Sequence, residues 1–324
     1  MSLDKLAALD LCDLRQPDIT SGGAAKNDKV LHIDGDYLAY FCAGNGDTPT
    51  GIARKTLLEN VEIAMGMSGC RKAVMHLSHR ATNKAHRYAI ATVKPYQGNR
   101  GGKAHPNNWE FLRNLMETYD GHEFTPVVWT TREADDAFAL LAAETNAVLR
   151  YRDKDMRMLP GLHLEWESHE LVEVPRVSIG ASIAAYDVVS ASGLQYGTKW
   201  FWLQMLHGDT ADHIPGLPKM INAAGKEKPV GEVAAKQILE GATNNAEAYQ
   251  RVAGAYRSCY GDAAYDAMAE QAGLLWLRTD RAASVRNAMI PFPAEPSMMA
   301  AFHRLEQRVK ESYETDHQYA QAQA

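Results

Sequence analysis

The acidic residues that could do chemistry gather in four short segments: HIDGD (32–36), READD (132–136), RDKD (152–155) and GDTAD (208–212). In three of them an acid directly follows a short apolar run that predicts a buried strand, at Asp34, Glu133 and Asp153. Ligands of an open parallel sheet collect outside the carboxyl ends of its strands. We therefore expect the segments to converge at one edge of a sheet, although they lie far apart in the sequence.

The spacing within each segment turns its carboxylates to one side. Asp153 and Asp155, two apart, face the same way on an extended chain. Glu133 and Asp136, three apart, share one side of the first turn of a helix, and GDTAD repeats that spacing. Carboxylates gathered in one cleft need cations or take up protons. Oxygen ligands of this kind select magnesium, manganese or calcium over zinc.

Two such ions, about 3.5–4 Å apart, would activate a water and stabilise the leaving oxygen of a phosphodiester displacement. Each segment also has a simpler interpretation. READD alone could be a helix N-cap, RDKD alone a solvated loop, and GDTADHIPG alone a turn followed by a cap. The metal site is favoured because the four segments occur together, three of them at equivalent strand ends.

The net charge of −6 over 324 residues argues against a wholly basic nucleic-acid-binding surface. The charges are unevenly distributed along the chain. From His79 to Arg113 the chain has seven Lys or Arg and one acid, Glu110. A basic strip beside an acidic cluster is a pattern that could hold a phosphate backbone near a metal site; an exposed basic loop is the alternative.

Strands alternate with helices in the first half of the chain, which predicts an α/β fold with a parallel sheet and crossover helices. The predicted strands are 29–33, 72–77, 126–131 and 147–151, the helices are 52–67, 108–119 and 134–145, and 162–167 with 171–179 form an appended hairpin. Beyond residue 195 the pattern is helical: 195–206, 231–240, 245–258, 262–276 and 297–312. We expect a leader at 1–28, a core at 29–194, a helical region at 195–312 and a frayed polar tail at 313–324.

Four scattered cysteines, without CxxC or zinc spacing, are typical of a reducing compartment. The sequence has neither the apolar stretch of a signal peptide nor a run of about 18 apolar residues, so we expect a cytoplasmic protein.

Five motifs in this order, HIDGDYLAY, YQGNR (96–100), READD, RDKDM and GDTADHIPGLP, resemble the 5'-nuclease superfamily over about residues 30–240. This superfamily includes flap endonucleases and the 5'→3' exonucleases of bacteriophages, and the short chain is most similar to the stand-alone phage enzymes. The resemblance implies a PIN-like α/β fold with two Mg²⁺ or Mn²⁺ ions. It assigns the metal-ligand role to eight acids: Asp34, Glu133, Asp135, Asp136, Asp153, Asp155, Asp209 and Asp212.

The resemblance also implies a basic arch at about 79–108 and a helix-hairpin-helix after the IPG segment, the latter with a possible K⁺ ion. Arg100 would contact the phosphate near the cut, and Tyr96 would stack on a base or pack beneath the arch. Asp34 and Asp136 would act in catalysis with Arg100 and Lys94. The implied DNA contacts are Arg80, Lys84, Arg87, Lys94, Tyr96, Arg100 and Lys103 in the arch, and Gly216, Gly231 and Lys236 near the hairpin.

Two positions depart from the superfamily pattern. The usual aspartate after the second strand is missing, because Ser78 and His79 stand there, and Gln97 replaces the usual lysine after Tyr96. Lys94 or Lys103 could supply the missing positive charge. Asp36, an extra acid beside Asp34, is expected at most to support the ligands.

The function expected from these motifs is a metal-dependent 5'→3' DNA exonuclease with 5'-flap endonuclease activity, active in DNA replication and, if phage-encoded, in the bacterial host cytoplasm. Its partners would be DNA with 5' ends or flaps, with RNA of RNA–DNA hybrids as a second candidate. Two alternatives stay open: a PIN-like ribonuclease, and a DNA-structure-binding protein with a weakened site.

Overall fold

The computed structural model describes residues 27–102, 104–142, 144, 146–177, 183–221 and 225–322, with side chains to residue 314. Most of the expected leader and Lys103 lie outside the described residues.

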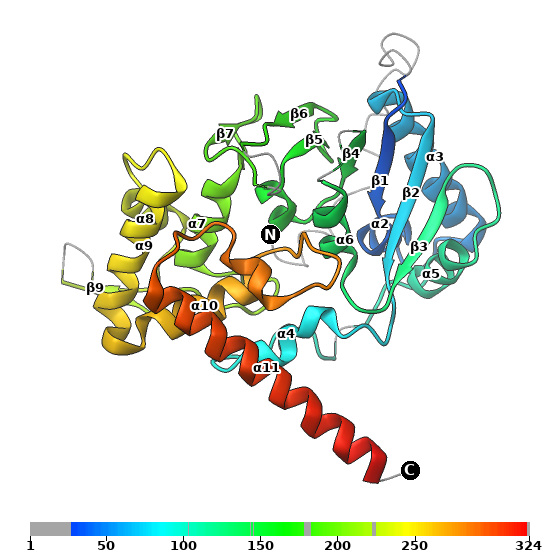
Figure 1. Ribbon diagram of the computed structural model, residues 1–324. Helices are drawn as coiled ribbons and strands as arrows, with labels where there is room; N and C mark the ends of the chain where they lie inside the picture. The colour runs from blue at the N-terminus through cyan, green and yellow to red at the C-terminus, as the bar shows by residue number, and fades with distance from the viewer. Residues whose placement is uncertain are drawn as a thin grey trace.

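A six-stranded sheet forms the centre of the first half of the chain, in the order β3-β2-β1-β4-β5-β6 (Figure 1). All neighbours pair in parallel except the last pair, which is an antiparallel hairpin at the edge of the sheet. The strands are β1 (Val30–Asp34), β2 (Lys72–Ser78), β3 (Thr125–Trp129), β4 (Ala147–Arg150), β5 (Gly161–Leu164) and β6 (Leu171–Val174). The expected α/β fold with a mostly parallel sheet and an appended hairpin is confirmed.

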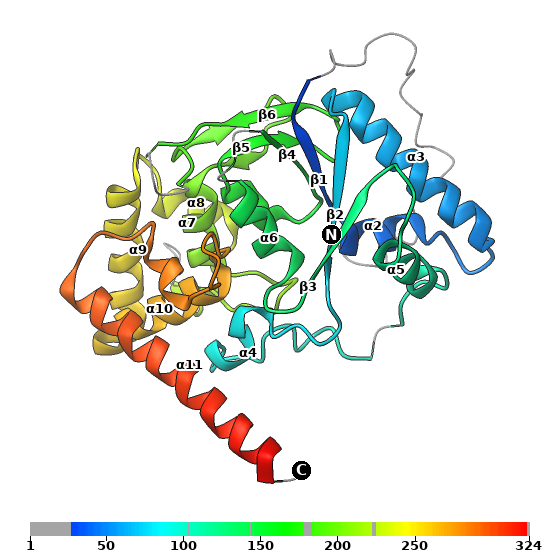
Figure 2. The ribbon, with the colours of Figure 1, turned by 45° about the vertical axis from the view of Figure 1, so that its right-hand side comes forward.

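Helices cover both faces of the sheet (Figure 2). One face carries α2 (Gly35–Cys42), α3 (Thr50–Ser68) and α5 (Trp109–Glu117), and the other carries α6 (Ala134–Leu141). The inner side of α3 is apolar at helical spacing and fully buried, as at Leu57 and Val61. This packing fixes the sheet whose strand ends carry the acids.

Helix α2 was not expected from the sequence, and it follows β1 without a loop. Gly35 makes this possible because a Cβ there would lie 2.6 Å from Leu77 Cδ2 and 2.9 Å from the His76 carbonyl oxygen. The immediate start of the helix makes Asp34 its N-cap.

The second half of the chain is helical, as expected. It contains α7 (Thr198–His207), α8 (Glu232–Ile238), α9 (Asn245–Tyr260), α10 (Ala264–Leu275) and α11 (Pro296–Ala322). Helix α7 is buried on almost every side, with Phe201 and Trp202 fully enclosed. Short pieces complete the chain: β7 (Val188–Val189), β8 (Gln195–Tyr196), and the 3-10 turns η3 (Lys84–His86), η4 (Lys154–Met158), η5 (Gly261–Ala263) and η6 (Val285–Met289).

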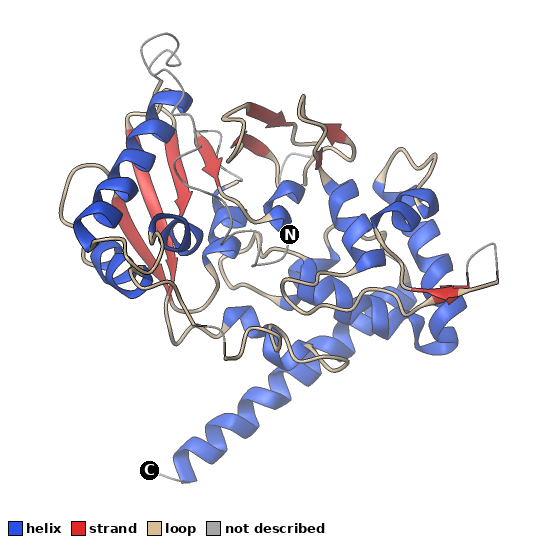
Figure 3. Ribbon diagram, turned by 180° about the vertical axis from the view of Figure 1, so that it is seen from behind, coloured by secondary structure: helices blue, strands red, loops and turns tan. Residues whose placement is uncertain are grey.

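Helix α11 continues to Ala322, so the frayed tail expected after residue 312 is wrong for the described residues. It projects from the body, with the C-terminus near its far end (Figures 1 and 3). Extending a helix that is already nucleated and packed adds one hydrogen bond per residue, so the polar sequence does not stop it.

The basic strip expected to form an arch packs against the C-terminal helices. It includes the short helix α4 (Arg87–Ile90), which lies beside α11 in Figures 1 and 2. The Thr92 hydroxyl donates to Glu270 at 2.6 Å, and Arg308 donates to the Ile90 carbonyl at 2.6 Å. This part of the strip is therefore tied to α10 and α11.

The expected helix-hairpin-helix is not confirmed. Between Gly216 and Gly231 the chain forms a small antiparallel pair, β9 (Met220–Ile221) with β10 (Glu227–Lys228), and residues 222–224 lie outside the described part. Separately, no helix in the described residues is long and apolar enough to cross a membrane.

Candidate metal centre

Carboxylates from distant parts of the chain meet at the carboxyl end of the sheet. Asp155, Asp209 and Asp212 each offer an oxygen atom, and these atoms lie within 4.8 Å of one another. Asp34, Asp135 and Asp153 belong to the same electrostatic group, because the negative charge of at least one other acid of the cluster contributes to raising the pKa of each. The expected convergence of the four acidic segments is therefore present.

The GDTADHIPG loop is held by two glycines that allow a tight crossing of the chain. Asp209 and Ile214 exchange backbone hydrogen bonds of 2.8 and 2.6 Å. Gly208 and Gly216 both have positive φ, and a Cβ on either would lie 2.3 Å from backbone atoms of the other side of the loop. Glycine is the residue that fits both conditions. The closed loop directs Asp209 and Asp212 toward the cluster.

The RDKD segment bends into the 3-10 turn η4 directly after β4. Asp153 caps this turn by accepting a 2.9 Å hydrogen bond from the Asp155 amide. Asp155 in turn accepts a 2.6 Å hydrogen bond from Gln204 on the buried helix α7. Gln204 positions a predicted ligand, yet its place in the apolar sequence of α7 gave no signal of that role.

Burial raises the pKa of most of these acids. It raises the pKa of Asp34 to about 7, against the opposing hydrogen bond from the Tyr37 amide. Burial, followed by neighbouring negative charge, also raises the pKa values of Asp135 and Asp155. Burial likewise raises the pKa of Asp153, where Lys154 opposes the shift. A group of acids with raised pKa values favours bound cations, which stabilise the ionised form.

Asp136 turns away from this group, so the expectation that it is a metal ligand and a catalytic residue is wrong. Both of its oxygens accept 2.8 Å hydrogen bonds from Arg87, and the amide of Arg278 donates a third at 2.9 Å. Burial acts to raise the pKa of Asp136, but Arg87 and Arg278 outweigh it and lower the pKa. On the first turn of α6, neighbouring acids point in different directions, and Asp135 is the one that faces the cluster.

Arg87 is likewise not placed to contact DNA as expected. It is 2% exposed, and it also donates to the Leu274 carbonyl at 3.0 Å. Lys84 lies at the border of the cluster, with its ammonium 3.4 Å from Glu133 and in contact with the side-chain oxygen of Gln97. These two cations of the strip therefore neutralise acids.

The YQGNR segment lies directly against the GDTADHIPG loop (residues 208–216), which we call the metal-site loop. The Tyr96 hydroxyl lies 2.9 Å from Glu133 and 3.0 Å from Asp212, and Tyr96 is 4% exposed, so it packs beneath the strip and cannot stack on a base. Gln97, at the position of the expected lysine, donates to Asp212 at 3.1 Å. Arg100 is half-exposed and forms an ion pair with Asp212.

The position of the missing aspartate has a structural role here. The Ser78 hydroxyl accepts a 2.9 Å hydrogen bond from the Ala134 amide at the start of α6. Asp36 accepts from the Ser78 amide at 3.1 Å and pairs with the buried Arg113. Asp36 is thus held by Ser78 and Arg113 and not by an acid of the cluster.

The other predicted DNA contacts lie apart from the acids or at the surface. Arg80 is exposed and pairs with Glu110 at 2.9 Å, and Lys94 is exposed. Lys236 is also exposed and pairs with Glu232 at 2.7 Å within α8. Gly231 precedes α8 as its N-cap, and Gly216 closes the metal-site loop.

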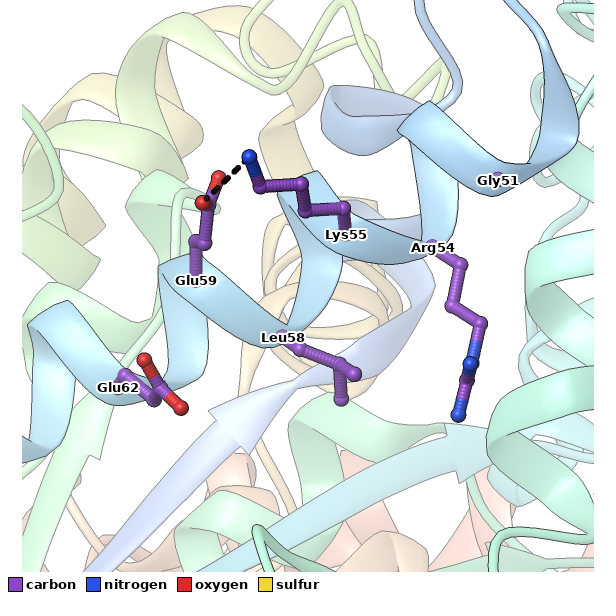
Figure 4. Close-up of a pocket in the computed structure, with 6 residues that line it drawn as sticks. All are labelled: Gly51, Arg54, Lys55, Leu58, Glu59 and Glu62. Carbon is purple, nitrogen blue, oxygen red and sulfur yellow. Dashed lines mark ion pairs between the residues drawn. The ribbon is translucent and has the colours of Figure 1, made fainter.

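A shallow surface hollow on α3 is a poor candidate for a functional site (Figure 4). All its lining residues come from this one helix, so no second element encloses a ligand. Lys55 and Glu59 form a 3.5 Å ion pair across it. A smaller cleft is lined by acids of the cluster, including Glu133, Asp135 and Asp155.

Comparison with solved structures shows the same fold in 5'-nucleases. A crystal structure of a bacteriophage T5 D15 flap endonuclease variant, a pseudo-enzyme–product complex with DNA and metal ions, matches with a TM-score of 0.52 and 12% identity, covering 87% of this chain and 99% of that one. T5 D15 protein co-crystallised with metal ions matches with a TM-score of 0.51 and 12% identity, covering 86% and 99%. No family model and no curated protein matches the sequence. The chain thus shares its overall fold, with a mostly parallel central sheet flanked by helices, with the T5 D15 nuclease, as the motifs implied.

Proposed function

We propose that this protein is a divalent-metal-dependent nuclease that hydrolyses DNA from or near a 5' end, as a 5'→3' exonuclease and a 5'-flap endonuclease. The observation that carries the proposal is the meeting of Asp155, Asp209 and Asp212 within 4.8 Å in a fold shared with a flap endonuclease. An acidic cluster alone would have many explanations. Its position at the carboxyl ends of parallel strands, beside a basic strip, favours this one.

The donor set fits Mg²⁺ or Mn²⁺ because the grouped side chains are carboxylates. Asp155, Asp209 and Asp212 would hold one ion, and Asp34, Asp135 and Asp153 would contribute to a second. When bound, such ions lower the pKa of a coordinated water and stabilise charge on the phosphate and the leaving oxygen.

Other residues of the chain would orient the acidic ligands and contact the phosphates of the nucleic acid. Gln204 fixes Asp155 from the side away from solvent, and Tyr96 fixes Glu133 and Asp212. Arg100, half-exposed at the rim of the cluster, can exchange its contact with Asp212 for a phosphate oxygen, since a guanidinium binds either anion. Lys94 and Arg80 would extend the positive charge along the nucleic-acid backbone.

The proposal is tested by incubating the protein with 5'-labelled duplex DNA, 5'-flap DNA and matched RNA and RNA–DNA hybrid substrates, in Mg²⁺ or in EDTA. We expect DNA products that require the metal, and a loss of at least about a thousandfold in rate for Asp155→Asn, since one of the charges that hold the metal is removed. The exposed surface variant Lys55→Met should cleave normally. Cleavage in EDTA, or unchanged cleavage by Asp155→Asn, would contradict the proposal; preference for RNA would identify a ribonuclease instead.

A further inference from the structure

One lysine lies inside the candidate metal centre. Lys154 stands between Asp153 and Asp155 in the turn η4, and its ammonium is 2.5 Å from Asp209 Oδ2 and 3.4 Å from Asp155 Oδ1. The side chains of Asp209 and Asp155 are 2% and 8% exposed, whereas that of Lys154 is 33% exposed. The ammonium therefore contacts two of the three carboxylates that form the tightest acidic group.

This contact places a cation against two buried carboxylates. A buried carboxylate without a compensating cation is strongly unfavourable, and Lys154 provides that cation.

A divalent ion and the Lys154 ammonium compete for the same oxygens. Mg²⁺ binds oxygens at about 2.0–2.1 Å, so an ion shared by Asp155 and Asp209 would lie only a few ångströms from the present ammonium. Two cations at that separation repel each other. The flexible, partly exposed stem of Lys154 allows its ammonium to move toward solvent when the ion binds.

We propose that Lys154 is a built-in counter-ion that holds Asp155 and Asp209 together in the metal-free protein and must be displaced by the divalent ion. The inference rests on the proposed function, because it concerns the same metal centre. It explains how the centre can be assembled before the metal binds. It also has a cost, since each binding event must break the contacts of Lys154, which lowers the affinity for the metal.

The test is calorimetric titration of the purified, chelator-treated protein with Mn²⁺ alone, compared between the wild type, Lys154→Met and Lys154→Arg. Removing the ammonium should tighten binding of at least one Mn²⁺ ion about tenfold or more, an increase that corresponds to one like charge removed from the site. Lys154→Arg retains a cation and should bind within about threefold of the wild type. Lys55→Met, which removes a lysine from an exposed ion pair on α3, is the matched control and should bind Mn²⁺ unchanged.

A second readout is the melting temperature with and without Mn²⁺. Without the ion, Lys154→Met should melt below the wild type; with the ion, the difference should shrink or reverse. If Lys154→Met does not fold, Lys154→Gln serves in both measurements. If the variants that lack the ammonium bind Mn²⁺ as tightly as the wild type or more weakly, only the counter-ion proposal is overturned. Absence of Mn²⁺ binding in every protein, wild type included, would instead refute the proposed metal-dependent function.

Discussion

Arg87 and Asp136 form a bidentate ion pair in the interior, with both nitrogen–oxygen distances at 2.8 Å. The pair joins the basic strip to the first turn of α6, and Arg87 also donates to carbonyl groups of the C-terminal half at Leu274 and Trp276. Three parts of the chain therefore meet at one guanidinium. Because Asp135 precedes Asp136, the pair also sets how α6 presents Asp135 to the metal centre.

We expect Arg87→Met to destabilise the fold by about 3–5 kcal/mol, because Asp136 would remain buried without its partner. The double variant Arg87→Met/Asp136→Leu should recover much of this loss, since a buried ion pair can often be replaced by apolar side chains. Urea denaturation measures both. Arg80→Met, which breaks an exposed pair with Glu110, should cost less than about 1 kcal/mol. Equal effects of Arg87→Met and Arg80→Met would contradict the structural role of Arg87.

Because the chain crosses itself closely in the metal-site loop, we expect Gly208→Ala to lower the free energy of unfolding far more than Gly225→Ala. Both glycines have positive φ, +73° and +72°, but a Cβ at Gly208 would meet the Ile214 oxygen at 2.3 Å, while Gly225 has nothing within 4 Å. The conformational strain of alanine, about 1 kcal/mol, is common to both. We expect Gly208→Ala to lose several kcal/mol in urea denaturation and to lose Mn²⁺ binding. Similar losses for the two variants would mean that the close crossing of the loop is unimportant.

The raised pKa of Asp34 predicts how stability depends on pH in the absence of metal. Its pKa lies at about 7 in the folded state and at the ordinary 3.8 in the unfolded chain, so the unfolded state ionises first as the pH rises. The stability of the metal-free protein should therefore fall between about pH 4 and pH 7, by about 1.4 kcal/mol for each unit of pKa difference at most. Thermal denaturation in EDTA measures this.

The matched comparison is Asp34→Asn, which does not ionise and should lose less stability across the same pH range. Added Mg²⁺ should oppose the loss in the wild type, because the ion binds the carboxylate form. Wild type and Asp34→Asn curves that run parallel from pH 4 to pH 7 would contradict the assigned shift.

The exposed position of Lys94 predicts an electrostatic role in DNA binding. Lys94→Ala should weaken binding about equally for DNA of different sequences, and the slope of log affinity against log salt should fall by about one. Fluorescence anisotropy with a labelled 5'-flap DNA in Ca²⁺ at several salt concentrations measures the slope. Lys55→Ala should leave the slope unchanged. An unchanged slope for Lys94→Ala would remove it from the DNA-binding surface.

Much of the fold follows from the sequence because apolar periodicity reports burial. The strands at β1, β2 and β4 are short apolar runs, and the acids at their ends are visible as clusters. The glycine that ends α3 has φ +69°, which is the usual left-handed stop of a helix. Such signals are local in the sequence, so they can be recognised without knowledge of tertiary contacts.

The parts that sequence analysis missed depend on long-range contacts. Asp136 looked equivalent to Asp135, but Arg87, 49 residues away, binds it from behind. Nothing in the sequence distinguishes Lys154, because a lysine between two aspartates is typical of a solvated loop. The start of α2 at Gly35 depends on close contact with β2, which no local propensity reports.

We propose that Asp155, Asp209 and Asp212, with their neighbours at the strand ends, form a divalent-metal centre. The most direct test is a crystal soaked in Mn²⁺ and measured by anomalous diffraction. We expect a strong peak bonded to oxygens of these three carboxylates, with a second peak near Asp34, Asp135 and Asp153. Crystals that diffract well but show no anomalous peak among these acids, even at saturating Mn²⁺, would contradict it.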